Sequence, residues 1–208
     1  MINQITALRV IPVAVIHDAK KAVPLARALV RGGLPCIEVT FRTDAAAEAI
    51  RSIHDEIPDI LVGAGTVTSC QQADLAIQAG AQFIVSPGIN AEVVKYVLQK
   101  NIAMFPGVMT PSELELAMHL GISHVKFFPA VAAGGTSMIK ALSAPYPDMH
   151  FMPTGGIRED NILDFLACDK VFACGGSWMV EKKLIESGDF EEITQRTRRV
   201  VELVKKVR

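Results

Sequence analysis

The sequence predicts an α/β protein folded as a closed (β/α)8 TIM barrel, and three observations support that prediction. Eight short runs rich in β-branched and aromatic residues recur along the 208 residues, starting 20 to 28 residues apart. The gaps between these runs show helical patterns. The runs are almost unbroken in apolar character, which is typical of parallel strands covered by helices. Eight such strand–helix units in a chain of this length favour one barrel domain over residues 1–208.

The runner-up interpretation is an open, doubly wound parallel sheet. It is disfavoured because no GxGxxG motif follows the first apolar run. The predicted strands, in chain order, are residues 8–16, 36–42, 61–67, 83–88, 103–109, 124–130, 150–156 and 170–178.

Two of the predicted helices have clear boundaries. Residues 110–113 (TPSE) combine an N-cap threonine, a proline at the first helical position and an acid placed to complete a capping box. Gly121 is expected to end this helix. The amphipathic segment 190–208 predicts a final helix, and the Lys and Arg residues at its end suit a helix C-terminus.

Composition and charge exclude several classes of protein. Half of the residues are hydrophobic, so the chain is not intrinsically disordered. The net charge of −1 gives no electrostatic reason to expect nucleic acid or an anionic membrane as a partner. No run reaches the ~18 apolar residues that a membrane helix needs. We interpret the four cysteines, none in a CxxC pair, as reduced core residues: Cys36, Cys70, Cys168 and Cys174.

Polar residues interrupt the first ten positions at Asn3, Gln4 and Arg9. A secretory leader needs an apolar stretch there, so none is expected. Together with the unpaired cysteines, this predicts a cytoplasmic protein.

Polar side chains share one face of the predicted strands. In the run 36–42, apolar residues alternate with three polar ones, which are Glu38, Thr40 and Arg42. In the run 124–130, Lys126 shares a face with His124 and Phe128, and in the run 61–67 Thr66 shares a face with Ala64. Since the apolar faces match an outer layer of helices, the polar faces are expected to point into the barrel, where catalysis occurs at the carboxyl ends of strands.

Lys126 is unusual because lysine is almost never fully buried without a partner. One interpretation is an ion pair with Glu38, or a Glu38–Arg42 pair, that only holds the barrel together. Buried ion pairs are weak evidence of stability, because desolvation offsets their attraction. The alternative is chemical: burial or the nearby Arg42 cation favours the neutral amine, which attacks carbonyl carbons and forms a Schiff base.

Paired glycines end the last two predicted strands, as Thr154-Gly155-Gly156 and Gly175-Gly176-Ser177. The loops at these two positions hold phosphate in many barrels, because glycine lets backbone N–H groups approach an anion. Plain turn chemistry is the competing explanation. No HxH or HExxH pattern occurs among the five histidines, so the residues give little support for a zinc site.

These residues lie in motifs that resemble the class I aldolases acting on 2-keto-3-deoxy-6-phosphogluconate (KDPG) and 4-hydroxy-2-oxoglutarate (KHG). The resemblance runs essentially end to end. It rests, in this order, on GGLPCIEVTFRT, VGAGTVTS, AGAQFIVSPG, FPGVMTPSE, VKFFPA, PTGGI and GGSW. It implies a (β/α)8 barrel, a homotrimer, no cofactor and no metal, with a phosphorylated keto acid and pyruvate as ligands and a place in the Entner–Doudoroff pathway.

Residue roles follow from the resemblance alone. It implies Lys126 as the Schiff-base lysine and Glu38 as the general acid/base. The other implied contacts fall into three groups: Arg42 and Thr66 for the substrate carboxylate; Pro87, Phe128 and Thr154 for the pocket; and Gly155, Gly156, Gly176 and Ser177 for the phosphate.

One departure bears on substrate choice, since many relatives have arginine in place of Val15. The sequence leaves open a gluconate-derived keto acid, a galactonate-derived one, or 4-hydroxy-2-oxoglutarate. It also leaves three other functions: a phosphosugar isomerase or epimerase, a non-catalytic barrel that binds a phosphorylated metabolite, and a metal-dependent aldolase.

Overall fold

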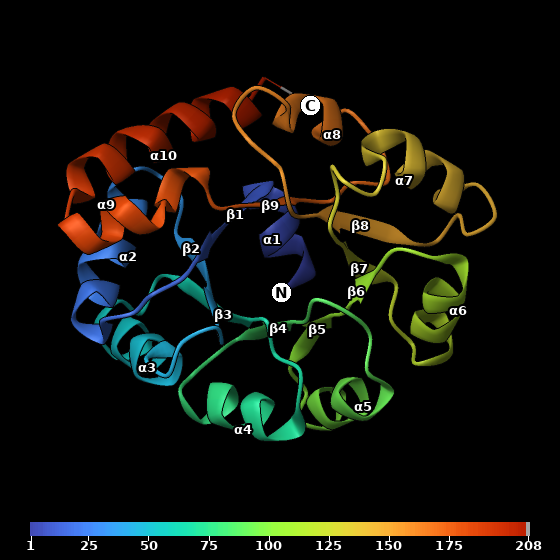
Figure 1. The fold of residues 1–208 in the computed structure, drawn as a ribbon, viewed down its shortest axis with the longest axis horizontal. Helices are drawn as coiled ribbons and strands as arrows, with labels where there is room; N and C mark the ends of the chain where they lie inside the picture. Colours follow the sequence, from blue (N-terminus) through green and yellow to red (C-terminus); the bar gives the residue numbers. More distant parts are fainter. Residues whose placement is uncertain (207–208) are drawn as a thin grey trace.

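Strands and helices alternate along residues 1–206, which are the residues described by the computed structural model (Figure 1). The strands are β1 (Val10–Ala14), β2 (Cys36–Thr40), β3 (Leu61–Gly65), β4 (Phe83–Val85), β5 (Ala103–Phe105), β6 (Gly107–Val108), β7 (His124–Phe127), β8 (His150–Pro153) and β9 (Cys174–Gly176). The α-helices are α1 (Ile2–Leu8), α2 (Ala22–Arg31), α3 (Ala46–Glu56), α4 (Cys70–Gln78), α5 (Ala91–Gln99), α6 (Pro111–His119), α7 (Gly135–Ser143), α8 (Ile162–Leu166), α9 (Lys182–Ser187) and α10 (Phe190–Val204). Two short 3-10 helices are η1 (Ala19–Lys21) and η2 (Trp178–Val180).

The strands form two parallel sheets that curl around a common interior, with α2 to α10 outside them (Figure 1). One sheet has six strands in the order β5-β4-β3-β2-β1-β9, and the other has three in the order β6-β7-β8. The register sets Val13 of β1 opposite Glu38 of β2, and Gly107 of β6 opposite Lys126 of β7. The functional side chains on β2 and β7 are therefore held by different sheets.

The prediction of one closed, eight-stranded TIM barrel is wrong, because the ladder is divided at two places. The predicted strand 103–109 is split into β5 and β6 at Pro106, which has no backbone N–H to donate to a neighbouring strand. At the other division, the pairs that link β8 to the segment around β9 within residues 1–206 are two isolated bridges, Phe151 to Val171 and Thr154 to Gly175. The result is a curled pair of sheets rather than one continuous sheet.

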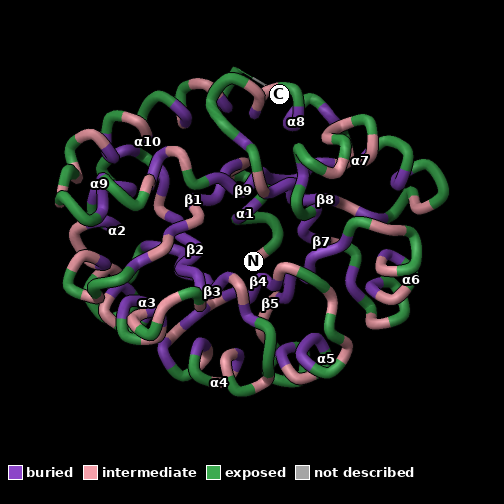
Figure 2. The backbone as a smooth tube through the Cα atoms, viewed as in Figure 1, coloured by how far each residue is buried: buried purple, intermediate pink, exposed green. Residues whose placement is uncertain are grey.

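The interior of the curled sheets is filled with apolar side chains toward the amino ends of the strands. Side chains in the interior include Ile11 of β1, Phe83 of β4 and Phe105 of β5. Ile5 of α1 is fully buried in the same cluster, and in the view of Figure 1 this helix lies within the ring of strands. Figure 2 shows the corresponding burial along the strands. The sequence did not predict α1, which closes the amino end of the interior.

The predicted alternation of strand faces is confirmed on β2 and β7. Ile37 and Val39 of β2, and Val125 and Phe127 of β7, belong to the larger cluster between strands and helices. Glu38 and Lys126 face the other way and meet across the interior. Polar groups at the carboxyl ends of the strands therefore share one small space.

The boundaries predicted for α6 are confirmed. The Thr110 side chain accepts a hydrogen bond from the Glu113 N–H, and the Glu113 carboxylate accepts one from the Thr110 N–H at 2.8 Å. Gly121 follows with φ of +77°. The helix predicted over residues 190–208 is α10, which ends at Val204, and residues 207–208 lie outside the described residues. Within residues 1–206, none of the helices has the length and apolar character needed to cross a membrane.

Candidate active site

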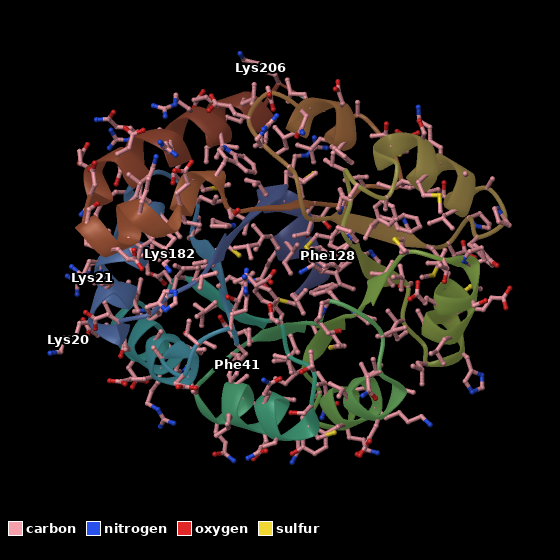
Figure 3. The ribbon with its side chains drawn as sticks, viewed as in Figure 1. Lys20, Lys21, Phe41, Phe128, Lys182 and Lys206 are labelled. Carbon is pink, nitrogen blue, oxygen red and sulfur yellow. The ribbon has the colours of Figure 1, made fainter. Side chains whose placement is uncertain are left out.

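A cavity of about 390 Å³ opens where the strands end, between the two sheets. It is lined by all eleven residues that the sequence and the resemblance placed at a site: Glu38, Arg42, Thr66, Pro87, Lys126, Phe128, Thr154, Gly155, Gly156, Gly176 and Ser177. Phe128 lies toward the middle of the ring in Figure 3, whereas Lys20 and Lys206 lie at the rim. Residues from positions 38 to 177 therefore meet at one cavity.

Lys126 and Glu38 form the centre of this cavity. The Lys126 Nζ lies 3.8 Å from Glu38 Oε1, and the residues are 5% and 0% exposed. The Nζ also lies 5.2 Å from the centroid of the Phe128 ring. A buried amine between a carboxylate and an aromatic ring is shielded from bulk water, and this is the environment in which lysine acts as a nucleophile.

Glu38 is a buried carboxylate whose lost contacts with water are not replaced by hydrogen bonds from the described residues. Within residues 1–206, neither of its oxygens accepts a hydrogen bond. Burial raises the pKa of Glu38 above its usual range, and the positive charge of Lys126 offsets part of that increase. A carboxyl group that holds its proton to higher pH is suited to give and take protons during a reaction.

Gly65 of β3 provides the space that the Glu38 side chain occupies. A Cβ atom at position 65 would lie 2.0 Å from Glu38 Oε1 and 2.7 Å from Glu38 Cδ. The register pairs Gly65 with Thr40 on the adjacent strand, so the carboxylate rests against bare backbone. A side chain at this position would displace the carboxylate relative to Lys126.

Thr66 lines the cavity, but strand alternation does not place it there. The expected alternation placed Thr66 and Ala64 on one inward face, but Ala64 packs in the cluster between strands and helices. Thr66 follows the last residue of β3 with φ of +58°, which turns its side chain toward the cavity. Left-handed backbone at a residue other than glycine is uncommon and often marks a functional site.

Arg42 is an exposed cation at the mouth of the cavity. Among residues 1–206, no carboxylate forms an ion pair with its guanidinium, in contrast to the paired Arg27, Arg158 and Arg196. The guanidinium is therefore available for a planar anion, which it can hold with two parallel hydrogen bonds.

The predicted site omitted Thr40 and Val13, which also line the cavity. The Thr40 hydroxyl donates a hydrogen bond to the Ala14 carbonyl at 3.0 Å and ties β2 to β1. Its position between Glu38 and Arg42 on one strand face was the signal that could have identified it. Val15, the position that the resemblance marked as a departure, is not among the lining residues.

The two glycine loops present backbone donors to the cavity. Gly155 and Gly156 follow β8 with φ of +96° and +80°, which favour glycine. Within residues 1–206, the N–H groups of Gly155, Gly156 and Ser177 donate no hydrogen bond to another residue. At the end of β9, a Cβ atom on Gly175 would lie 2.4 Å from the Thr154 hydroxyl, so this glycine accommodates Thr154. Free N–H groups of this kind suit an anionic group.

His124 lies two residues before Lys126 but faces the packed end of the interior. Its ring stacks on His150 at 4.8 Å and meets the edge of Phe172 at 5.0 Å. These contacts give His124 a packing role. Among residues 1–206, no three His, Cys, Asp or Glu side chains gather closely enough to hold a metal ion.

The fold and site together describe an enzyme suited to carbonyl chemistry through an imine, with a buried amine, a buried acid/base group and a free guanidinium. The chain belongs to the KDPG and KHG aldolase family, whose model matches residues 1–196. It is 49% identical over 197 residues to a 2-dehydro-3-deoxy-phosphogluconate aldolase of Treponema pallidum, covering 95% of this chain and 94% of that relative.

Two solved structures are similar over nearly the whole chain. A KDPG aldolase from Legionella pneumophila, with pyruvate captured as a covalent carbinolamine intermediate, gives a TM-score of 0.93 at 40% identity, covering 96% of this chain and 98% of that one. A KDPG aldolase of Zymomonas mobilis with 3-phosphoglycerate gives a TM-score of 0.89 at 38% identity, covering 96% and 94%.

Proposed function

We propose that this protein is a class I aldolase that reversibly cleaves 2-keto-3-deoxy-6-phosphogluconate to pyruvate and glyceraldehyde 3-phosphate through an imine on Lys126. The observation that carries the proposal is the buried Lys126 Nζ, 3.8 Å from a Glu38 carboxylate that accepts no hydrogen bond within residues 1–206. The names of the Treponema and Legionella relatives support the substrate, and the pyruvate carbinolamine in the Legionella structure supports the covalent step.

The reaction starts when the amine of Lys126 attacks the C2 ketone of the substrate. Loss of water from the resulting carbinolamine gives a protonated imine. This cation accepts the electron pair of the C3–C4 bond when that bond breaks, which a neutral ketone does poorly. The apolar ring of Phe128, 5.2 Å from the amine, keeps water away from the imine.

Glu38 moves the protons in this scheme. Its carboxylate takes the proton of the C4 hydroxyl, directly or through a water molecule, while the C3–C4 bond breaks and glyceraldehyde 3-phosphate leaves. The proton returns to C3 of the enamine, and hydrolysis of the imine releases pyruvate. Its raised pKa brings Glu38 toward working pH, where a group can both accept and return a proton.

The remaining residues of the cavity bind different parts of the substrate. Arg42, with Thr66, holds the carboxylate beside the ketone, because a guanidinium matches a planar carboxylate with two hydrogen bonds. Pro87 and Phe128 enclose the imine, and Thr154 binds a substrate hydroxyl. The glycine loops receive the phosphate through Gly155, Gly156, Gly176 and Ser177, and the free N–H groups of Gly155, Gly156 and Ser177 act as its donors.

The same site accommodates 4-hydroxy-2-oxoglutarate as a second substrate, cleaved to pyruvate and glyoxylate. The family description, which includes both substrates, supports this extension. We also propose that residues 1–208 act as one domain, that three copies assemble into a homotrimer, and that the enzyme works in the cytoplasm in the Entner–Doudoroff pathway. It needs no cofactor or metal and binds neither nucleic acid nor membrane.

The direct test is cleavage of a panel of keto acids, with the pyruvate formed measured by its NADH-dependent reduction. The panel contains the gluconate-derived and galactonate-derived phosphorylated keto acids and 4-hydroxy-2-oxoglutarate. We expect the highest kcat/KM with the gluconate-derived substrate and no loss of rate in a chelator. Loss of rate in the chelator would favour a metal-dependent aldolase. Tight binding of all three without pyruvate formation, or isomerisation of a phosphosugar, would contradict the proposal.

Replacing Arg42 with lysine is expected to raise KM for the keto acid by about tenfold while kcat changes little, since a single ammonium replaces a bidentate contact. The measurement is steady-state kinetics with Arg51→Lys as control, because Arg51 is an exposed arginine on α3, outside the cavity. A KM within twofold of the unmodified enzyme would remove Arg42 from carboxylate binding.

Replacing Gly65 with alanine is expected to lower kcat by about tenfold or more, because small displacements of reacting groups cost rate steeply. The new Cβ would lie 2.0 Å from Glu38 Oε1 unless the carboxylate moves. Gly88→Ala is the matched control, since a Cβ there meets no atom within 4 Å. Equal kcat for the two variants would show that the position of Glu38 is not critical.

A further inference from the structure

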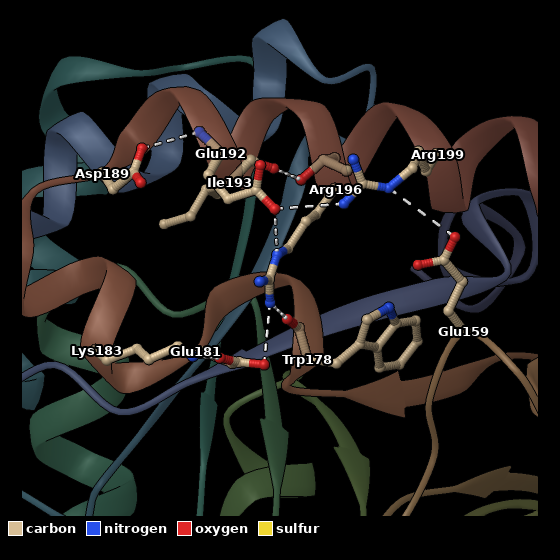
Figure 4. A network of polar contacts seen from close by, with 10 residues as sticks. Glu159, Trp178, Glu181, Lys183, Asp189, Glu192, Ile193, Arg196 and Arg199 are labelled. Carbon is tan, nitrogen blue, oxygen red and sulfur yellow. Dashed lines mark hydrogen bonds and ion pairs between the residues drawn. The ribbon is translucent and has the colours of Figure 1, made fainter.

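The two glycine loops at the cavity are joined to α10 by one network of charged side chains (Figure 4). The loop after β9 continues into Trp178 and Glu181, and the loop after β8 continues into Glu159. On α10, Arg196 contacts Trp178 and Glu181, Arg199 contacts Glu159, and Glu192 contacts both arginines. None of these residues lines the cavity, so the proposed function leaves their role open.

Arg196 is the centre of the network and makes three polar contacts with one guanidinium. Its Nε lies 2.7 Å from Glu192 Oε1, and its Nη1 donates to the Trp178 carbonyl at 2.8 Å and lies 3.0 Å from Glu181 Oε1. The side chain is 22% exposed, so these contacts are partly shielded from water. Arg196 also holds the pKa of Glu192 below its usual range.

The contact at Trp178 acts on the loop that ends in Ser177. A Cβ on Gly176 would lie 1.8 Å from the Trp178 ring, so the indole packs directly against the Gly176 backbone. Arg196 fixes the carbonyl of the same tryptophan. The position of the backbone at residues 176 and 177 is therefore tied to α10 through Trp178.

The helix that bears Arg196 is itself held firmly. The Thr194 hydroxyl donates to the Ala28 carbonyl of α2 at 3.1 Å and is 1% exposed. A Cβ on Gly32, just after α2, would lie 2.4 Å from Thr197 Cβ, so the two helices are in close contact there. Arg196 therefore projects from a fixed element toward the loop after β9.

The link to the other loop is weaker. Arg199 contacts Glu192 Oε1 at 3.4 Å and Glu159 at 4.0 Å, and the side chains of Arg199 and Glu159 are each 48% exposed. Exposed pairs of this kind contribute little. The network thus favours Arg196 over Arg199 as the residue that controls loop geometry.

We infer that Arg196 is a positioning residue that fixes the loop of Gly176 and Ser177 against the phosphate end of the substrate. The inference rests on the proposed function, which places the phosphate at this loop. Arg196 acts through Trp178 and does not touch the substrate. Its loss is expected to weaken recognition of the phosphate while leaving the chemistry at Lys126 intact, because the two ends of the cavity are held by different contacts.

The test compares Arg196→Gln and Arg196→Lys with Lys183→Ala. Lys183 contacts Glu181 at 3.3 Å in the same network and is 76% exposed, so its loss removes a positive charge without releasing Trp178. Three quantities are measured: KM and kcat for the phosphorylated keto acid, competitive inhibition by inorganic phosphate, and exchange of the pyruvate methyl protons for deuterium in D2O. The exchange reports imine and enamine formation without any phosphate.

For Arg196→Gln, we expect KM and the inhibition constant of phosphate to rise together by about tenfold, with pyruvate exchange within about twofold of the unmodified enzyme. Arg196→Lys, which keeps the charge but not the three-contact geometry, is expected to shift both in the same direction by less. Lys183→Ala is expected to change neither.

Two results would overturn the inference. One is a phosphate inhibition constant in both Arg196 variants that equals that of Lys183→Ala. The other is an equal loss of exchange and cleavage, which would indicate a general structural role; the lysine variant decides this if the glutamine variant does not fold. Absence of pyruvate exchange in the unmodified enzyme would instead overturn the proposed function, and the inference with it.

Discussion

Replacing Lys126 with alanine is expected to lower kcat/KM for aldol cleavage by about 10⁴-fold or more, equivalent to about 5 kcal/mol of lost transition-state stabilisation. The reason is chemical rather than steric. Without a primary amine no imine forms, so the electrons of the C3–C4 bond have no cationic acceptor. The measurement is the rate of pyruvate formation at substrate concentrations well below KM, with circular dichroism used to confirm that the variant folds.

Two further variants separate the amine from the charge. Lys126→Arg keeps a cation near Glu38 but cannot form an imine, so we expect it to be as inactive as the alanine variant. Lys95→Ala removes an exposed lysine from α5 and is expected to keep full activity. A Lys126→Arg enzyme with substantial turnover would mean that the charge, and not the imine, is what the reaction requires.

Replacing Glu38 with glutamine is expected to lower kcat by about 10³-fold, within the range that general acid–base catalysis contributes. Glutamine has nearly the same shape but cannot accept the C4 hydroxyl proton or return one to the enamine. Imine formation with pyruvate is expected to continue, because Lys126 remains. The measurement compares turnover with the fraction of enzyme trapped as a pyruvate adduct. Full turnover in this variant would contradict the role given to Glu38.

The same variant is also expected to change the stability of the fold, because burial removes the Glu38 carboxylate from water and disfavours its charged form. Its pKa is raised in the folded protein, so the native state retains a proton that the unfolded chain releases at lower pH. The contribution of this group to the free energy of unfolding is therefore greatest below the usual pKa of glutamate and is lost as pH rises through the folded pKa. Glu38→Gln removes that loss and is expected to be at least as stable as the unmodified enzyme at neutral pH, as measured by urea unfolding.

The core of the site could be predicted because it follows from strand alternation. Glu38 and Lys126 each alternate with apolar residues in a buried strand. Because side chains alternate between the two faces of a strand, both residues point inward whether or not the sheet closes into a barrel. The glycine loops were predictable for a similar reason, since paired glycines directly follow two strands. The residue roles, in contrast, came from the family resemblance.

Other features depend on tertiary geometry that no local pattern encodes. Thr66 enters the cavity through a left-handed backbone conformation after β3, which alternation cannot foresee. The importance of Gly65 is visible only when Glu38 is seen against it. Arg196 lies in a helix that reads as an ordinary amphipathic surface helix, and its contact with Trp178 joins residues 18 positions apart.

The error in the fold has a specific cause. The run 103–109 reads as one strand by its apolar content, and the prediction passed over Pro106, which divides it into β5 and β6. The helix α1 was missed because its seven residues lack a clear apolar face and bury only Ile5. Neither error affects the site, because its side chains come from the carboxyl ends of other strands and the loops that follow them.

The measurement that tests the central claim most directly is borohydride reduction in the presence of pyruvate, followed by peptide mass mapping. We expect a single reduced pyruvyl adduct on the peptide containing Lys126, present in Glu38→Gln and absent in Lys126→Ala. An adduct on another lysine, or none in an enzyme that cleaves the keto acid, would contradict an imine at Lys126.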